Sequence, residues 1–348
     1  MNLFSLTRKL IDIPSVTGDE TDVGEFLESH LKGLGYSVEL QEVEKDRFNV
    51  IATTGAWPRI VFSTHMDTVP PHIASSEDEE RIYGRGACDA KGIIAAQINA
   101  AERLRSDGVN EIGLLFTVDE ETGSLGAQVA NNEKPARPPE YLINGEPTDN
   151  KLARATKGSL RLTLKTSGRA SHSAYPEQGE SAIEKLLDIL ERIRKSVWPV
   201  DEILGETTCN IGLINGGTRA NVVPASAQAV LQLRLVSEVR PVKAILEAAI
   251  DGRAEVQYLS EHDPIHLHTV DGLEPCVVRF TTDIPYLSHW GTPLLLGPGS
   301  ILNAHTDHEF IEKRELAEAV ELYARLVRAL LKKETGQEVS GVTGGGPR

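Results

Sequence analysis

The chain has 348 residues, of which 40% are hydrophobic and 25% are charged, and its formal net charge is −15. This length is enough for two domains, and the composition is that of an ordinary soluble globular protein. The excess of negative charge argues against nucleic acid as a partner, because that role needs a basic surface. No apolar run approaches the roughly 20 residues that span a bilayer, so no membrane association is expected.

Residues 1–10 lack the apolar core and the cleavage site of a signal peptide, which predicts a cytoplasmic location. The three cysteines, Cys88, Cys209 and Cys276, are far apart and odd in number. No disulfide framework is therefore expected.

Apolar periodicity predicts the elements of the first part of the chain. Residues 3–10 indicate a surface helix, and Thr17 or Asp19 is expected to cap a second helix that Gly33 and Gly35 end. Strands are predicted at 36–43, 48–52, 60–63, 111–118 and 141–143, and a buried helix at 93–104. Because strands alternate with helices, we expect a mostly parallel sheet.

The pattern changes near Lys157. Strict alternation of apolar and polar side chains at 159–167 indicates a sheet with one solvent-exposed face. The following elements are a helix at 181–195, strands at 209–213 and 227–236, a helix at 241–250 and a strand at 254–259. This β-α-β-β-α-β order predicts a ferredoxin-like insertion.

From about residue 264 the first pattern resumes, with a strand at 292–296 and a helix at 314–333. We therefore assign residues 1–157 and 264–339 to one domain and 158–263 to an inserted domain. The glycine-rich segment 340–348 is expected to be a flexible tail.

The buried strand at 60–63 leads into His65 and Asp67. Residues two apart on an extended chain point to the same side, and ligands of open α/β sheets bind at the carboxyl ends of the strands. An imidazole is a common zinc ligand, and a carboxylate beside it can orient the ring. Taken alone, the pair favours a simpler interpretation, a loop histidine hydrogen-bonded to a nearby aspartate.

Similar polar residues follow other strands or turns of the same domain. They are Asp89, Glu120 with Glu121, Glu146, and His305 with Asp307, His308 and Glu309. Several carboxylates at one sheet edge would repel one another without a cation. Mixed nitrogen and oxygen ligands suit zinc, cobalt or manganese better than calcium, and a carboxylate can bridge two metals.

Five segments resemble, in order, the metal motifs of a di-zinc metallohydrolase family that includes acetylornithine deacetylase, succinyl-diaminopimelate desuccinylase, aminoacylase and carboxypeptidase G. They are residues 63–70, 84–92, 119–124, 145–148 and 304–305. Each motif alone is weak evidence for the family. The five together occur in the family's order across nearly the whole chain, and this combination is specific. The resemblance implies an α/β fold: a zinc-peptidase-like, three-layer catalytic domain with a mostly parallel sheet, and an inserted ferredoxin-like lid and dimerisation domain.

The resemblance also implies two zinc ions per subunit, for which cobalt or manganese could substitute. The implied ligands are His65, Asp89, Glu121, Glu146 and His305. Asp89 would bridge the two ions, with His65 and Glu146 completing one site and Glu121 and His305 the other.

Glu120 is expected to act as general base and then as general acid, and Asp67 to orient His65. A metal lowers the pKa of water, so that a nearby carboxylate can take its proton. Cys88 replaces the small residue that more often precedes the bridging aspartate. We expect it to be buried, although a thiol near zinc can be sensitive to oxidation.

In the inserted domain, residues 168–176 resemble the histidine motif of the family's lid. In dimeric relatives this histidine, His172 here, reaches the partner's active site and helps to hold the oxyanion. Residues 216–224 resemble a loop whose asparagine, Asn221, contacts substrate, and Arg234 matches a strand arginine that binds a substrate carboxylate. The alternatives are a surface histidine without a role and an arginine on a solvated strand face. A homodimer through the lid is expected.

The motifs give different indications about the substrate. Residues 296–301, including the expected substrate contacts Gly299 and Ser300, resemble acetylornithine deacetylases. Thr156 and Lys157 depart from the Arg-Arg-Gly-Ser run of desuccinylases, and His308 stands where many relatives carry Asp or Asn.

The sequence therefore predicts release of an amino acid from an N-acyl amino acid such as N-acetylornithine. The alternatives are a desuccinylase, a di- or exopeptidase that cuts short peptides, and a non-enzymatic metal-binding relative.

Overall fold

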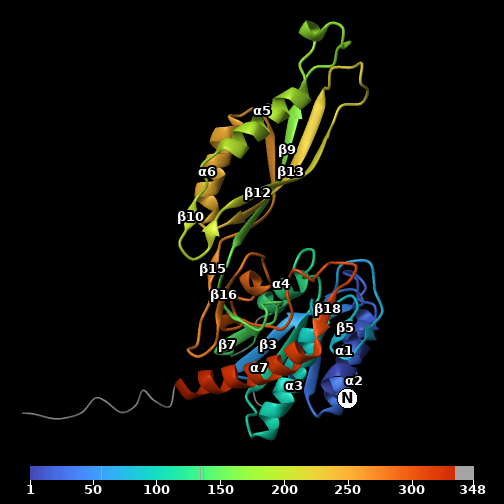
Figure 1. Cartoon of the computed structure of the whole chain (residues 1–348), viewed down its shortest axis with the longest axis vertical. Coiled ribbons are helices and arrows are strands. Elements are labelled where there is room, and N and C mark those ends of the chain that lie inside the picture. Colours follow the sequence, from blue (N-terminus) through green and yellow to red (C-terminus); the bar gives the residue numbers. More distant parts are fainter. Residues whose placement is uncertain (56, 134, 136, 334–348) are drawn as a thin grey trace, which may run out of the picture. The chain divides into compact units, whose positions relative to one another are not determined.

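The computed structural model describes residues 1–55, 57–133, 135 and 137–333 (Figure 1). It divides into two compact units. The large unit comprises residues 1–154, 267–276 and the chain from residue 282 onward, and the inserted unit comprises 155–266 and 277–281. The tail predicted at 340–348 lies outside the described residues.

The structural boundaries differ slightly from the predicted ones. The inserted unit begins at residue 155 rather than 158 and ends at 266 rather than 263. Ala155 and Thr156 pair antiparallel with His266 and Ile265, which brings both segments into the unit. The short segment 277–281 also belongs to it.

The principal sheet has nine strands among the described residues. Its order is β1 (Ser37–Glu44), β2 (Arg47–Thr53), β6 (Ile112–Thr117), β3 (Ile60–His65), β7 (Tyr141–Asn144), β17 (Thr292–Leu295), β8 (Leu152–Thr156) and β15 (Ile265–His266), with β16 (Pro275–Val278) beside β8. The central strands β6, β3, β7 and β17 are parallel, and the pairs towards either edge are antiparallel. The predicted parallel sheet is confirmed for this core.

Two hydrophobic layers cover the core strands. One contains residues of α1 (Leu3–Ile11), α2 (Thr21–Gly33), α3 (Lys91–Ser106) and α7 (Lys313–Lys333), and the other residues of α4 (Leu125–Asn132) and around the 3-10 helix η2 (Ile284–Tyr286). Ile60 and Phe62 of β3 belong to the first layer and Val61 to the second. An uninterrupted apolar run is what a strand covered on both faces needs, and the three-layer fold is confirmed.

The cap predicted for α2 is wrong. Glu20 occupies the N-cap position and makes no side-chain capping hydrogen bond. Thr17 instead donates its hydroxyl to Asp67 Oδ2 at 2.8 Å, and the Glu20 carboxylate accepts two hydrogen bonds from Arg47. The side chains of Thr17 and Glu20 therefore bond to residues distant in the sequence instead of capping the helix.

The inserted unit is a four-stranded antiparallel sheet with two helices. Its elements are β9 (Gly158–Ser167), α5 (Ala182–Lys195), β12 (Thr208–Gly216), β13 (Ser226–Leu235), α6 (Val239–Ile250) and β14 (Glu255–His262), with the strand order β12-β13-β9-β14. This confirms the ferredoxin-like insertion. Arg161 and Lys165 are exposed as predicted, whereas Thr163, on the same face of β9, is only 8% exposed.

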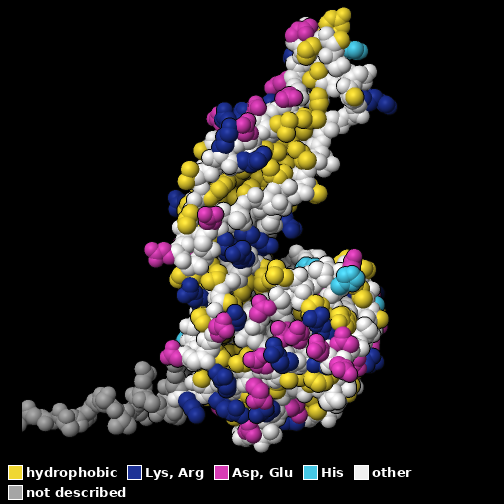
Figure 2. All heavy atoms as spheres, in the orientation of Figure 1, with side chains coloured by type: hydrophobic (Ala, Val, Ile, Leu, Met, Phe, Trp, Pro, Cys, Tyr) yellow, Lys and Arg dark blue, Asp and Glu magenta, His cyan; other side chains and the backbone are white. Residues whose placement is uncertain are grey.

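Several short elements complete the fold. They are β4 (Ser76–Glu77), β5 (Arg81–Tyr83) and β18 (Phe310–Glu312), which form one small sheet, β10 (Val200–Asp201) paired with β11 (Gly205–Glu206), and the 3-10 helix η1 (Pro176–Gln178). Acidic side chains are spread over the visible face of the large unit (Figure 2), in keeping with the net charge of −15. Within the described part of the chain, no helix has the length and apolar character to cross a membrane.

Candidate metal centre

His65, the last residue of β3, is almost completely buried. Its Nδ1 lies 3.0 Å from the carbonyl oxygen of Asp67, and its Nε2 lies 3.0 Å from Oδ1 of Asp89. Because a carbonyl oxygen can only accept, Nδ1 carries the hydrogen of that bond. In the neutral ring Nε2 then keeps its lone pair, which is the form that a metal ligand needs.

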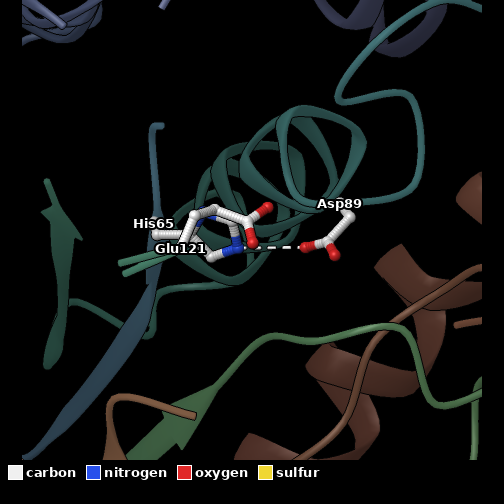
Figure 3. A group of neighbouring side chains, drawn as sticks. All are labelled: His65, Asp89 and Glu121. Carbon is white, nitrogen blue, oxygen red and sulfur yellow. Dashed lines mark hydrogen bonds and ion pairs between the residues drawn. The ribbon is translucent and has the colours of Figure 1, made fainter. Parts of the chain in front are cut away.

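Asp89 lies between the two candidate histidines. Its Oδ1 faces Nε2 of His65, as the dashed line in Figure 3 shows, and its Oδ2 lies 3.3 Å from Nε2 of His305. Burial opposes ionisation of Asp89, but the hydrogen bonds to His305 and His65 hold its pKa below the ordinary value. One oxygen towards each histidine is the arrangement that a bridging carboxylate requires, so the geometry supports the bridging role.

The turn after β6 carries Glu120 and Glu121, and Asp67 holds this turn in place. The two oxygens of Asp67 accept hydrogen bonds from the backbone N–H groups of Glu120 and Glu121, each at 3.1 Å. Oε1 of Glu121 lies 3.0 Å from Nε2 of His305. Oδ1 of Asp67 lies 3.4 Å from Nδ1 of His65, so Asp67 contacts the histidine that it was expected to orient. It also holds the motif that contains Glu120 and Glu121.

Glu146 follows β7, and its Oε2 lies 4.0 Å from Nε2 of His65. Burial is the main reason that the pKa of Glu146 and that of Glu120 are raised well above the ordinary value, and neighbouring carboxylates add to the effect. Without a cation, burial and the neighbouring carboxylates therefore favour the protonated form of these two side chains.

His305 is the most exposed of the candidate ligands, with 47% of its side chain accessible. Its backbone has a positive φ of 63°, which is uncommon for a residue other than glycine. Hydrogen bonds to Asp89 and Glu121 raise the pKa of His305 to about 10. The fifth motif thus joins the other motifs through these two carboxylates.

This donor set fits divalent metal ions. One ligand atom from each of His65, Asp89 and Glu121 lies within 4.8 Å of the others (Figure 3). Oε1 of Glu146 is buried and has no hydrogen-bond partner among the described residues. A buried acceptor without a donor is costly, and a cation would satisfy it. Nitrogen and carboxylate donors suit zinc, cobalt or manganese.

The expected substrate groups of the inserted unit lie at its surface. His172 is exposed, and its Nδ1 accepts a hydrogen bond from the N–H of Ala174 at 3.1 Å. Its loop lies beside the loop of Asn221, whose carbonyl oxygen accepts from the N–H of Ser173 at 3.0 Å. Arg234 is half-buried on β13, and burial together with the charge of Arg161 lowers its pKa. His172 and Asn221 are thus neighbours within the unit.

Gly299 and Ser300 follow β17 in a tight loop. Gly299 has a φ of +83°, and a Cβ there would lie 2.8 Å from Cβ of Cys88, so a larger residue would clash. Cys88 is completely buried, as predicted, and burial above all raises the pKa of its thiol well above the ordinary value. The neutral thiol is the less reactive form, which opposes the expected sensitivity to oxidation.

Two buried charged groups of this region were not recognised from the sequence. Asp283 accepts a hydrogen bond from the hydroxyl of Thr117 at 2.7 Å, and burial raises its pKa to about 6. Lys91 donates to the carbonyl oxygen of Ile13 at 2.6 Å, and burial lowers its pKa to about 7. No spacing pattern in the sequence indicates that Asp283 lies near the candidate ligands. For Lys91, its position two residues after Asp89 could have indicated this.

Comparison with known proteins gives a consistent result. The model of "Peptidase family M20/M25/M40" matches residues 61–329. A peptidase M20 domain-containing protein of Schizosaccharomyces pombe is 37% identical over 337 residues, covering 94% of this chain and 84% of the relative. A probable carboxypeptidase of Aspergillus terreus is 38% identical, covering 94% of this chain and 86% of the relative.

Solved structures share the fold. The aminopeptidase PepT of Bacillus cereus superposes with a TM-score of 0.78 at 23% identity, covering 95% of this chain and 98% of that one. The YXEP protein of Bacillus subtilis, described as a dinuclear metal-binding peptidase, gives a TM-score of 0.68 at 15% identity, covering 95% and 98%. At these identities the likeness establishes the fold.

Proposed function

The chain belongs to peptidase family M20/M25/M40 and is a hydrolase of linear amide or peptide bonds. From this premise we propose that the enzyme releases an amino acid with a free carboxylate from a short peptide or an N-acyl amino acid. The observation that carries the proposal is the position of Asp89, with one oxygen towards His65 and the other towards His305. Relatives named as probable carboxypeptidases favour a peptide substrate.

We propose that Glu120 carries the proton during the reaction. It is partly buried and adjacent in sequence to the candidate ligand Glu121, and burial and neighbouring carboxylates raise its pKa well above the ordinary value, which suits a group that must accept and then donate a proton. It would take a proton from water as the new carbon–oxygen bond forms. The same proton would pass to the leaving nitrogen as the carbon–nitrogen bond breaks. Divalent ions, when bound, supply a Lewis acid at the carbonyl and lower the pKa of water.

The proposed metal content is two zinc ions, with cobalt or manganese as substitutes. His65 and Glu146 would hold one ion, Glu121 and His305 the other, and Asp89 both. The contacts of Asp89 with both histidines, and of Glu121 with His305, support this division.

Substrate contacts are proposed for two parts of the molecule. In the inserted unit they are His172, Asn221 and Arg234, and in the large unit the loop of Gly299 and Ser300. A guanidinium is suited to a substrate carboxylate. The outer strand β12, with Leu213 61% exposed and Ile214 51% exposed, supports a homodimer formed through the inserted units.

A second candidate substrate is N-acetylornithine, which the stretch 296–301 favours by its resemblance to acetylornithine deacetylases. Both candidates leave an amino acid with a free carboxylate, so they differ in the acyl side rather than in the bond that is broken.

The experiment is a substrate panel with protein that has been stripped of metal and reloaded with zinc or cobalt. It contains N-acetylornithine, other N-acyl amino acids, dipeptides, and longer peptides with a free or an amidated carboxyl terminus. We expect release of the C-terminal amino acid and a large loss of rate on amidation. Turnover of the amidated peptides from their amino termini would contradict the proposal, and so would full turnover without metal.

The cytoplasmic location expected from the sequence remains a prediction. Fractionation of cells followed by detection of the protein tests it.

A further inference from the structure

The segment after His305 contains a buried carboxylate that the proposed mechanism does not use. Glu309 is 1% exposed and directly precedes β18. Its Oε1 accepts hydrogen bonds from the backbone N–H groups of Gly86, Cys88 and Asp89 at 3.0, 3.1 and 3.1 Å. Three donors of the loop that ends at Asp89 therefore converge on one oxygen.

The second oxygen of Glu309 pairs with Arg85. Oε2 lies 2.7 Å from Nη1 of Arg85, and the two side chains are 0% and 1% exposed. The same Nη1 donates to the carbonyl oxygen of Thr306 at 3.1 Å, and Nε donates to that of Pro71 at 3.3 Å. The guanidinium thus connects the loop before Asp89 with the residue that follows His305.

We propose that Glu309, paired with Arg85, is a positioning residue for the metal centre. Its carboxylate holds the loop 86–89 so that Asp89 presents one oxygen to each histidine, and the pair also fixes the backbone next to His305. This inference rests on the proposed function, because it takes the contacts of Asp89 to be those of a metal bridge.

The role of Asp67 supports this interpretation. Asp67 accepts hydrogen bonds from the backbone N–H groups of Glu120 and Glu121. It therefore holds the motif of these two residues as Glu309 holds the motif of Asp89. In both cases a buried carboxylate binds the main chain at the candidate ligand itself. Groups that orient metal ligands in this way typically change metal affinity or activity about 10–100-fold when they are replaced.

The arrangement needs a carboxylate with two accepting oxygens. A glutamine has one accepting oxygen and one NH₂ group, so it cannot satisfy both Arg85 and the three N–H donors. One of these buried groups would lose its partner, and the loop would shift to recover it. Glu309→Gln therefore keeps the shape of the side chain and removes the function that we assign to it.

A matched control lies three residues further along. Glu312 pairs with Arg81 at 3.6 Å, but the two side chains are 36% and 39% exposed and do not touch the loop 86–89 through any described hydrogen bond. Glu312→Gln removes the same charge from the same segment. An exposed ion pair contributes little, so this variant should behave as the wild type.

The test uses wild-type protein, Glu309→Gln and Glu312→Gln, each stripped of metal and shown to be folded by circular dichroism. Zinc affinity and stoichiometry are measured by competition with a chromophoric chelator, well below the unfolding temperature. The visible spectrum of the cobalt-loaded protein reports ligand geometry. We expect Glu309→Gln to bind at least one ion about 10–100-fold more weakly and to show an altered cobalt spectrum, while Glu312→Gln matches the wild type.

Wild-type affinity and an unchanged cobalt spectrum in Glu309→Gln would overturn the inference, even if its melting temperature were lower, because that result describes a purely structural ion pair. If Glu309→Gln does not fold, Arg85→Lys replaces it, since lysine keeps the charge but cannot reach Glu309, Thr306 and Pro71 together. Unchanged metal affinity and an unchanged cobalt spectrum in Arg85→Lys would likewise overturn the inference. A wild-type protein that binds no divalent ion would instead overturn the proposed function itself.

Discussion

In the large unit His65, Asp89 and Glu146 are buried and the candidate ligands contact one another, whereas in the inserted unit His172 and Asn221 lie at the surface with local contacts. His65 and Asp89 touch each other, and Asp67 and Glu309 hold the main chain of the neighbouring motifs. His172, by contrast, has a hydrogen bond two residues along its own loop. A change in the large unit should therefore disturb several groups at once, and a change in the inserted unit should disturb one.

The largest effect is expected for Asp89→Asn. The amide cannot offer a charged oxygen to both histidines, so metal content and activity should be lost together. Because even residues that only orient ligands cost about 10–100-fold, we expect a loss of metal affinity of at least about 100-fold. Metal analysis after dialysis and rate measurement check this. Asp107→Asn, at the other end of α3, is the control, and metal binding unchanged in Asp89→Asn would show that Asp89 is not a ligand.

Glu120→Gln should separate chemistry from metal binding within the same buried cluster. A general base typically contributes about 10²–10⁴-fold, so kcat should fall by that factor while metal content stays at the wild-type level. Glu111→Gln, just before β6 at the strand's opposite end and 46% exposed, is the matched control. A rate near that of the wild type with intact metal content would remove Glu120 from the proposed mechanism.

His172→Ala tests whether the inserted unit takes part in the reaction. A lost oxyanion donor costs about 10²–10³-fold in kcat. Metal content should not change, since His172 is not one of the proposed ligands and its ring accepts a hydrogen bond from Ala174 of its own loop. His266→Ala, another exposed histidine of the unit, serves as control. If both variants behave as the wild type, His172 is a surface histidine without a role.

The proposed homodimer can be tested with the same variants. Inactive Glu120→Gln and His172→Ala subunits are mixed under conditions that allow exchange. If His172 acts in the partner's active site, one site of each heterodimer carries both defects and the other carries neither, so activity should partly return. No recovery after demonstrated exchange would place His172 in its own subunit's site or outside the reaction.

The smallest effect concerns stability and pH. In the metal-free chain, hydrogen bonds to Asp89 and Glu121 raise the pKa of His305 from 6.5 to about 10, and burial raises the pKa of Glu120 and Glu146 above 4.5. A raised pKa means that the protonated form stabilises the fold. The contribution of His305 is complete below pH 6.5 and is lost as the pH rises through about 10. Protonation of Glu120 and Glu146 also stabilises the metal-free fold, and this contribution is likewise lost as the pH rises.

We therefore expect the melting temperature of the metal-free protein to fall between pH 6.5 and 10 by more than that of the metal-loaded protein. Because His305 is half exposed, the difference should be about 2–4 °C, the shift that about 1 kcal/mol produces in a domain of 150–250 residues. Calorimetry at several pH values measures it. His305→Ala should reduce the difference, and a metal-free protein that becomes more stable over this range would contradict the assignment.

Local patterns in the sequence were enough to predict the main elements and both sheets. The run at 60–63 predicts a strand buried on both faces, and β3 is one. The alternation at 159–167 predicts a half-exposed strand, and β9 shows it except at Ser159 and Thr163, which are buried. These patterns succeed because side-chain periodicity follows directly from backbone geometry. The resemblance of five motifs to a known family likewise indicated the residues that surround Asp89, and the family is confirmed.

Tertiary structure alone decided how these residues are held. Thr17 is a good helix cap by local rules, but its hydroxyl binds Asp67, 50 positions away. Glu309 binds the N–H of Asp89 across 220 positions, and Asp67 binds the main chain of Glu120 across 53. No spacing in a single sequence encodes such contacts, because they depend on where parallel strands and their loops meet after folding. The sequence therefore determined which groups could form the centre, and the packing of the loops determined which buried carboxylates orient them.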